Sequence, residues 1–316
     1  MAFPMKELEV HNDLLDDHEA MEKQFREEGY LFFRGVLDPD AVEAVREKYF
    51  SILVEDYGVV DPGQDLPVWN GKDVSEFPIK VPEAYGSGTW EKFTSNPKIH
   101  AFFERVMGEP ISWVPSTEYR LNPPAPEDPE DWVAGRHQDG FFNEGIPFRT
   151  CWVPFTDIDA ECGGLTIAPG LNKLGYLHDR GAPPKYGIPA DAIKESDWAR
   201  PEAYHPGDVL IFGEDTPHAG LVNRSKVFRL SMDIRFSAKS DPQPVVGELS
   251  AFGAGWITID TAGGPVTLTV DDRSYLRLKD GAQLPVSEME QFLQVGERMM
   301  AGRDGDRALV VRPQKG

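Results

Sequence analysis

The chain has 316 residues, 40% of them hydrophobic, which is enough for one large domain or two smaller ones around a substantial core. Acidic residues outnumber basic residues by 53 to 32 without any basic run, so the net charge of −21 argues against nucleic acid and anionic membranes as partners. No apolar stretch approaches about 18 residues and no apolar leader follows a basic start, so we expect a cytoplasmic protein. The two cysteines, Cys151 and Cys162, fit no zinc or redox spacing, so free thiols are expected, with a disulfide as the alternative.

The first hundred residues predict helices around one strand. The acidic segment 14–28 is helical in character, and Gly29 ends it before the apolar run 31–33. Pro39 suits the first position of a second helix, because its missing N–H would be unpaired there anyway. A third helix is expected at about 96–108. Apolar residues of the second helix recur at helical spacing and should pack on a sheet: Ala41, Val42, Val45, Tyr49 and Ile52.

The segment 58–88 between these helices is rich in Pro, Gly and Asp and predicts a long loop. It contains Trp69 and Tyr85. Aromatic residues in a long loop either belong to a lid over a site or pin the loop to the body of the protein, and the sequence leaves both readings open.

Strand-like runs dominate the middle of the chain, at 111–121, 137–142, 148–155, 165–168, 209–212, 219–222 and 227–236. Because helices precede the strands, we predict a mostly β fold with flanking helices, a double-stranded β-helix (jelly roll, cupin-like) core. In the last run, apolar and polar residues alternate, which places Arg229 on the polar face. A cation inside a barrel mouth is costly unless it has an anionic partner.

The end of the chain predicts a hairpin, from 256–260 and 265–270, and a helix at 286–300. These elements look too small to form a core of their own, so their apolar residues must be buried elsewhere. We therefore expect a jelly-roll domain at 1–240 and an extension at 241–316 that docks on the same domain. Docking on a second copy, in a homodimer, is the alternative.

A metal site is predicted by His137, Asp139 and His218. His137 and Asp139 are two residues apart in a strand-like run, so both side chains point to one face and can bind one ion. Two imidazoles and a carboxylate leave three positions of an octahedron open, which suits non-haem Fe(II) that must bind a cosubstrate and O2. His178 and His205 are alternative ligands, but one lies in a polar loop and the other beside a Pro-Gly turn.

The pattern resembles the phytanoyl-CoA dioxygenase superfamily of Fe(II)- and 2-oxoglutarate-dependent oxygenases. His-x-Asp, the distal His218 and Arg229 eleven residues further on carry the resemblance, which runs from about residue 25 to 237. Residues 29–37 are similar to the family's opening strand. Residues 163–170 are similar to its glycine- and proline-containing signature, with Leu171-Asn172 in place of the family's Ser-His.

This resemblance implies that the three ligands bind Fe(II) and that 2-oxoglutarate chelates it. The distal carboxylate would pair with Arg229, whose position fits the family better than those of Arg224 and Arg235. Thr150 and Trp152 fall where relatives contact 2-oxoglutarate, although a simple core role for Trp152 is the alternative. The implied reaction consumes O2 and releases succinate and CO2, and the retained Asp139 favours hydroxylation or another oxidation over halogenation.

The substrate is less well defined. Phe141 and Phe142 follow the metal carboxylate, and successive strand residues face opposite sides, so one of them should flank the substrate. Specificity should lie in the 58–88 loop, the 123–135 loop and the C-terminal extension. Because no basic cluster is present, a small metabolite or natural-product intermediate is favoured over an acyl-CoA. A cupin-type metalloenzyme without 2-oxoglutarate and a catalytically dead binding protein are the other classes considered.

Overall fold

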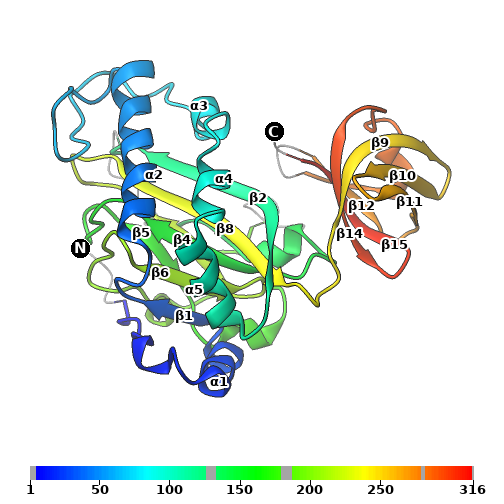
Figure 1. Ribbon diagram of the computed structural model, residues 1–316, viewed down its shortest axis with the longest axis horizontal. Coiled ribbons are helices and arrows are strands. Elements are labelled where there is room, and N and C mark those ends of the chain that lie inside the picture. The colour runs from blue at the N-terminus through cyan, green and yellow to red at the C-terminus, as the bar shows by residue number, and fades with distance from the viewer. Residues whose placement is uncertain (1–4, 126–132, 179–186, 279–281, 315–316) are drawn as a thin grey trace.

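The computed structural model describes residues 5–125, 133–178, 187–278 and 282–314 (Figure 1). A larger N-terminal region, ending with β8, lies beside a smaller C-terminal region that begins with β9. The helices are α1 (His18–Glu28), α2 (Pro39–Ser51), α3 (Pro82–Tyr85), α4 (Thr89–Thr94), α5 (Pro97–Met107) and α6 (Val286–Met289). None of the helices in these residues is long and apolar enough to cross a membrane.

The strands of the N-terminal region are β1 (Tyr30–Phe33), β2 (Ile111–Asn122), β3 (Val133–His137), β4 (Arg149–Pro154), β5 (Gly164–Ile167), β6 (Val209–Gly213), β7 (His218–Leu221) and β8 (Arg229–Ala238). They form two antiparallel sheets, of order β1-β6-β4-β8-β2 and β3-β7-β5. From β2 to β8 the chain passes from one sheet to the other between consecutive strands, as in a double-stranded β-helix. The predicted jelly-roll core is confirmed.

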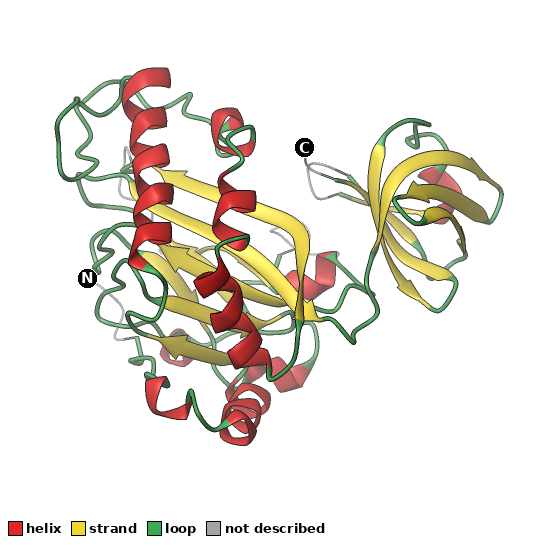
Figure 2. Cartoon of the chain, viewed as in Figure 1, coloured by secondary structure: helices red, strands yellow, loops and turns green. Residues whose placement is uncertain are grey.

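Helices α2, α4 and α5 lie across one face of the five-stranded sheet (Figure 2). Pro39 occupies the start of α2, as predicted, and Asn96 caps α5 by accepting hydrogen bonds from the N–H groups of Lys98 and Ile99. The apolar residues of β8 and the residue before it are fully buried in the core under these helices: Phe228, Leu230, Met232, Ile234 and Phe236. The polar face of β8 is therefore turned towards the second sheet, as the alternation predicted.

The loop 58–88 is irregular apart from α3, and Trp69 packs against the same core, so this side chain pins the loop to the body. Cys151 and Cys162 are buried and free, as expected.

One predicted strand is largely wrong. β3 ends at His137, and the chain turns into the 3-10 helix η3 (Asp139–Phe142) instead of continuing as a strand to residue 142. The turn is set by tertiary contacts: the N–H of Gly140 donates to the carbonyl of Glu214 at 2.7 Å. A Cβ atom at Gly140 would overlap the hydroxyl of Tyr176 and lie 3.1 Å from that same carbonyl oxygen, so this close approach favours glycine.

The C-terminal region differs from the prediction. Its strands are β9 (Val245–Gly253), β10 (Trp256–Thr261), β11 (Gly264–Thr269), β12 (Tyr275–Arg277), β13 (Gln283–Pro285), β14 (Arg298–Asp304) and β15 (Arg307–Pro313). The predicted hairpin is present as β10 and β11. The predicted helix 286–300 is wrong, because only α6 is helical and 298–304 is strand β14.

These strands form one sheet of order β11-β10-β9-β14-β15-β12-β13, and a further pairing of β11 with β15 closes five of them into a ring. The ring encloses a hydrophobic cluster of its own, which includes Leu249, Ile259, Leu268 and Met299. The expectation that this segment cannot form a core was therefore wrong, because it counted only one hairpin and one helix. We call residues 245–313 the C-terminal barrel.

Candidate active site

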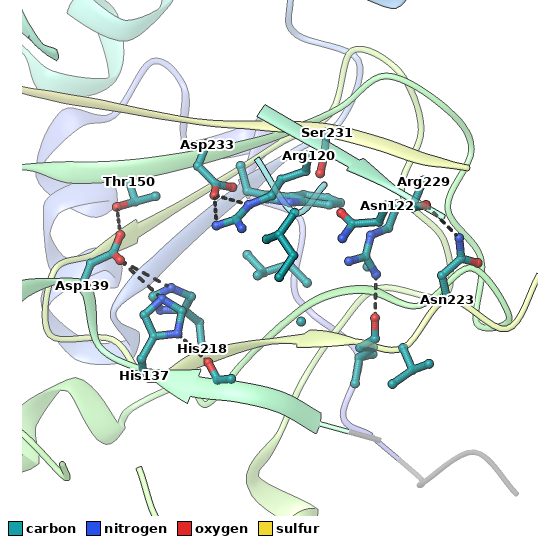
Figure 3. Close-up of a pocket in the computed structure, with 18 of the residues that line it drawn as sticks. Arg120, Asn122, His137, Asp139, Thr150, His218, Asn223, Arg229, Ser231 and Asp233 are labelled. Carbon is teal, nitrogen blue, oxygen red and sulfur yellow. Dashed lines mark hydrogen bonds and ion pairs between the residues drawn. The ribbon is translucent and has the colours of Figure 1, made fainter. Parts of the chain in front are cut away.

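His137, Asp139 and His218 meet at the mouth between the two sheets (Figure 3). One ligand atom from each lies within 4.8 Å of the others. The Nε2 atoms of His137 and His218 lie 3.5 and 3.9 Å from Oδ1 of Asp139. Two imidazole nitrogens and a carboxylate oxygen at these separations can bind one ion on a single face and leave the opposite face open.

The fold brings these residues together through a strand pair and one extended residue. Antiparallel pairing of β3 with β7 places His137 opposite His218, at the end of both strands. Gln138 is extended (φ −123°, ψ 127°), so Asp139 points to the same side as His137 although it already belongs to η3. His137 and Asp139 therefore point to the same side, as their spacing predicted, although Asp139 lies beyond the end of β3.

Backbone carbonyls fix the orientation of both imidazoles. Nδ1 of His137 lies 2.6 Å from the carbonyl oxygen of Gly135, and Nδ1 of His218 lies 3.0 Å from that of Thr216. A carbonyl can only accept, so each Nδ1 carries the proton and each Nε2 keeps a free lone pair for a metal. Burial, and next the neighbouring His137, lowers the pKa of His218 to about 3, which keeps this ring neutral.

Asp139 is buried and held by two donors. Its Oδ2 accepts hydrogen bonds from Thr150 Oγ1 at 2.8 Å and from Arg235 Nη2 at 2.7 Å, which leaves Oδ1 facing the two histidines. Burial alone would raise the pKa of Asp139, but the Arg235 guanidinium holds that pKa well below its usual range. The carboxylate is therefore ionised, as metal binding requires.

Gln138, between the two ligands, is fully buried and fastened on three sides. Its Nε2 donates to the carbonyls of Gly175 and Asp215 at 2.9 and 2.7 Å, and its Oε1 accepts from the N–H of Leu177. Its backbone N–H donates to Nε2 of His178 at 2.9 Å, so His178 supports the site instead of binding the metal. His205 is exposed and pairs with Asp157.

A cavity of about 630 Å³ extends from the metal ligands between the two sheets. The polar face of β8 forms one wall, with Arg229, Ser231, Asp233 and Arg235. The loops 58–88 and 123–135 contribute Ile79, Pro123, Pro124 and Ala125, while residues 126–132 lie outside the described part of the chain. No lining residue in the described part comes from beyond Arg235, so the described residues of the C-terminal barrel do not border this cavity.

Arg229 lies across the cavity from the metal ligands (Figure 3). Its Nη1 donates to the carbonyls of Leu221 and Cys162 at 2.6 and 3.4 Å, while its buried Nε has no partner. In the part of the chain that the structure describes, no carboxylate pairs with this guanidinium. Burial lowers the pKa of Arg229 to about 10, as expected for a cation that lacks an anion.

Two further buried polar atoms in this wall lack partners: the hydroxyl of Ser231 and Oδ1 of Asn122. Ser231 is two positions from Arg229 in β8, so the alternation of apolar and polar residues places both on the same face. This alternation in the sequence could have identified Ser231 as a residue of the cavity wall. Nothing in the sequence marked Asn122 or Gln138, because both depend on tertiary contacts.

The two rivals of Arg229 are accounted for. Arg235 is bonded to Asp139 and Ser116, and Arg224 does not line the cavity. A third arginine of the cavity, Arg120, donates twice to Oδ2 of Asp233, at 3.0 and 2.9 Å. Arg229 is therefore the arginine of this cavity wall that has no anionic group beside it in the described residues.

Of the other predicted site residues, Thr150 and Trp152 line the cavity, whereas Phe141 and Phe142 do not. Trp152 also packs edge-on against Tyr204, so it is a core residue and a wall residue at once. The ring of Phe141 stacks on His178 at 3.9 Å. Because η3 replaces the strand, the reasoning that one phenylalanine faces the substrate loses its basis, and that contact stays a prediction.

The donors present fit Fe(II) and 2-oxoglutarate. The ligand atoms of His137, Asp139 and His218 face one point, and the tautomers of the histidines and the charge of the aspartate suit a divalent ion. Across the cavity lies the buried guanidinium of Arg229, with two unpaired polar neighbours. Unpaired buried groups cost free energy unless a ligand satisfies them. A dicarboxylate that reaches from the metal to Arg229 would accept hydrogen bonds from the two donors among them, Arg229 Nε and the Ser231 hydroxyl.

Comparison with known proteins agrees with this geometry. The family model of phytanoyl-CoA dioxygenase (PhyH) matches residues 25–231. The chain is 31% identical over 239 residues to the 1-deoxypentalenic acid 11-beta-hydroxylase of Streptomyces arenae, which covers 72% of this chain and 83% of the relative. The enzyme of the same name from Streptomyces exfoliatus is 29% identical over the same shares.

A solved structure, EvdO2 from Micromonospora carbonacea var. aurantiaca, shares the fold with a TM-score of 0.50 and 18% identity, over 72% of this chain and 95% of that one. The C-terminal barrel lies beyond the residues that the family model matches. The chain belongs to the phytanoyl-CoA dioxygenase (PhyH) family of non-haem oxygenases that use Fe(II) and 2-oxoglutarate.

Proposed function

We propose that this enzyme hydroxylates a compact natural-product intermediate at the cavity described above, with His137, Asp139 and His218 as the Fe(II) ligands and Arg229 as the anchor of 2-oxoglutarate. The single observation that carries the proposal is the pairing, in one cavity, of this three-ligand cluster with a buried guanidinium that lacks a carboxylate. Such a pairing suits a dicarboxylate that chelates a metal at one end.

Each residue has a defined task. Asp139 and the two histidines leave one face of the ion open, and bound Fe(II) supplies the redox chemistry that joins O2 consumption to substrate oxidation. Arg229, with the hydroxyl of Ser231 beside it as a second donor, binds and orients the distal carboxylate. Trp152 restricts the width of the cavity beside the chelate.

The overall reaction balances without any group outside the family's chemistry. A substrate C–H bond, O2 and 2-oxoglutarate give the C–OH product, succinate and CO2. Because Asp139 occupies the third ligand position, no place is free there for a halide, and hydroxylation is the proposed outcome.

Cavity size supports a compact substrate. About 630 Å³ must hold 2-oxoglutarate and the substrate together, which suits a small molecule of a few rings. The relatives in Streptomyces are named for 1-deoxypentalenic acid, so compact carbocyclic acids are the first substrates to test. The negative net charge argues against an acyl-CoA. The cytoplasmic location and the homodimer stay predictions.

Anaerobic titration of 2-oxoglutarate into Fe(II)-loaded protein, followed by aerobic assay of succinate with a panel of carbocyclic acids, tests the proposal. We expect binding that requires the metal, and succinate formed in equal amount to hydroxylated product for at least one acid. Metal-independent 2-oxoglutarate binding, or none at all, would contradict the proposed function.

A further inference from the structure

The turn that begins with the metal ligand Asp139 is held from outside by the C-terminal barrel. η3 ends at Phe142, and its last carbonyl groups point towards β12 and β13 of that barrel. The side chain of Gln283 donates from Nε2 to the carbonyl of Phe141 at 3.1 Å, and Arg277 donates from Nη1 to that of Phe142 at 3.3 Å. The end of a short helix has carbonyls without partners inside the helix, and here another domain supplies donors.

Asn143 lies at the centre of this contact and is buried. Its Nδ2 donates to the backbone carbonyl of Asp139 at 2.7 Å. Its Oδ1 accepts from Nη1 of Arg277 at 3.1 Å and from Nη1 of Arg312. One amide therefore connects two guanidinium groups of the C-terminal barrel to the residue that supplies the anionic metal ligand.

The two guanidinium groups that hold this turn have an unfavourable environment for cations. Arg312 is 5% exposed, and in the described residues neither Arg277 nor Arg312 pairs with a carboxylate. Arg277 also lies over the ring of Phe142, 5.1 Å from its centroid. Burial, and next the neighbouring Arg277, lowers the pKa of Arg312 to about 9. A buried and a half-buried cation around one neutral amide cost free energy, which argues that this contact has a task beyond packing.

Backbone packing locks the two regions together beside the turn. The N–H of Arg303 donates to the carbonyl of Gly145 at 3.1 Å. Gly145 and Gly302 face each other so closely that a Cβ atom on either would overlap the other chain segment. Around them, apolar residues of both regions form one cluster: Val114, Ile146, Phe148, Tyr275, Met300 and Val310.

We propose that the C-terminal barrel is a positioning part of the active site: Arg277 and Arg312, acting through Asn143, fix the carbonyl of Asp139 and so hold its carboxylate in register with the two histidines. The inference rests on the proposed role of Asp139 as a metal ligand. It assigns the barrel to metal binding although its described residues do not border the cavity.

Asn143→Asp is the sharpest test, because it keeps an oxygen for the two arginines and removes the N–H that holds Asp139. Co(II) is titrated anaerobically into the metal-free protein, and its affinity and visible ligand-field spectrum are recorded without any turnover. We expect about a 10- to 100-fold weaker Co(II) affinity, the usual loss when an outer contact of a ligand is removed, with an altered spectrum.

Arg312→Met should weaken Co(II) binding in the same way, whereas Arg312→Lys, which keeps the charge and a donor, should restore most of the affinity. Arg298→Met is the matched control, because Arg298 begins strand β14 of the same barrel and its side chain donates to Gln314, away from Asn143. Gly302→Ala should separate the two regions and weaken Co(II) binding too. Its control is Gly263→Ala, where the nearest atom to a new Cβ lies 3.7 Å away.

Unfolding is measured for every variant. This distinguishes a variant that no longer folds from a folded variant in which the carboxylate of Asp139 is displaced from the two histidines. Wild-type Co(II) affinity and spectrum in folded Asn143→Asp and Arg312→Met would overturn the inference alone. Wild-type protein that binds no Co(II) would overturn the proposed function and this inference together.

Discussion

The two ends of the cavity are built differently. At the metal end, the atoms of the ligands that do not face the metal position are already paired: Nδ1 of His137, Nδ1 of His218 and Oδ2 of Asp139 each have a protein partner. At the arginine end, Arg229 Nε, Ser231 Oγ and Asn122 Oδ1 are buried without partners. The protein thus orients the three metal-binding side chains by itself, whereas two donors at the arginine end, Arg229 and Ser231, keep unpaired atoms, as the proposed binding of 2-oxoglutarate there requires.

The largest expected effect is at the metal end. Asp139→Asn removes the only charged ligand of the cluster and should abolish turnover and weaken Co(II) binding by at least about 100-fold. Because Arg235 then loses its buried counter-ion, we also expect a lower stability, by about 3–5 kcal/mol. Calorimetric titration and thermal unfolding measure the two effects.

Asp208→Asn is the matched control for this variant, because Asp208 is a buried aspartate paired with Arg34 outside the cavity. It should lose stability without losing metal affinity. Turnover at the wild-type rate in the Asp139→Asn protein would show that the cluster is not the metal site.

Arg229→Met should affect only the opposite end. Loss of charged hydrogen bonds to a carboxylate, worth about 1.5–3 kcal/mol each, predicts about 10- to 100-fold weaker 2-oxoglutarate binding or more, with Co(II) affinity unchanged. Arg200→Met is the control, since Arg200 is also buried and also bonded to backbone carbonyls, but away from the cavity. An unchanged 2-oxoglutarate affinity would show that Arg229 is not the anchor of the cosubstrate.

The sequence could predict the features of this protein that depend on local patterns, but not those that depend on contacts between distant residues. The alternation in β8 and the His-x-Asp spacing are local patterns, so the buried face, the polar-face position of Arg229 and the pair of His137 and Asp139 followed from them. The third ligand, His218, and the role of Arg229 came from the resemblance to the family. The 3-10 turn after Asp139 depends on a contact with Glu214, and the restraint on Asn143 depends on arginines more than 130 positions away, so no local pattern contained them.

The C-terminal barrel was misjudged for a related reason. Apolar residues at 289, 292, 293, 295 and 299 are compatible with helical spacing, but Gly296 adopts a positive φ of 91° and ends that possibility. The chain then forms strand β14, which pairs with the next strand, β15, and with β9, which lies far away in sequence. Helical periodicity over a short window cannot exclude such long-range strand pairing.

Thr150→Val tests the metal end with a smaller change. The hydroxyl of Thr150 donates to Oδ2 of Asp139, so its loss should weaken Co(II) binding by about 10-fold and leave 2-oxoglutarate affinity nearly unchanged. Thr166→Val is the control, a buried threonine on β5 that donates to the carbonyl of Ala199. If Thr150→Val instead weakens only 2-oxoglutarate binding, Thr150 contacts the cosubstrate, as the family resemblance implied.

Ser231→Ala should give the smallest effect, with opposite signs in the free and the bound protein. The hydroxyl is buried and unpaired without a ligand, so its removal should leave the free protein as stable as before or stabilise it by about 1 kcal/mol. With 2-oxoglutarate bound, the same removal loses a hydrogen bond worth about 0.5–1.5 kcal/mol, or about a 2- to 10-fold lower affinity. The rise in unfolding temperature on adding 2-oxoglutarate should therefore shrink, while Co(II) affinity stays unchanged.

The control is Ser237→Ala, because Ser237 is a buried serine on the same strand that does not line this cavity. This variant should keep the full rise in unfolding temperature on adding 2-oxoglutarate. If Ser231→Ala lowers the stability of the free protein as much as that of the complex, the arginine end is already satisfied by the protein, and the contrast between the two ends does not hold.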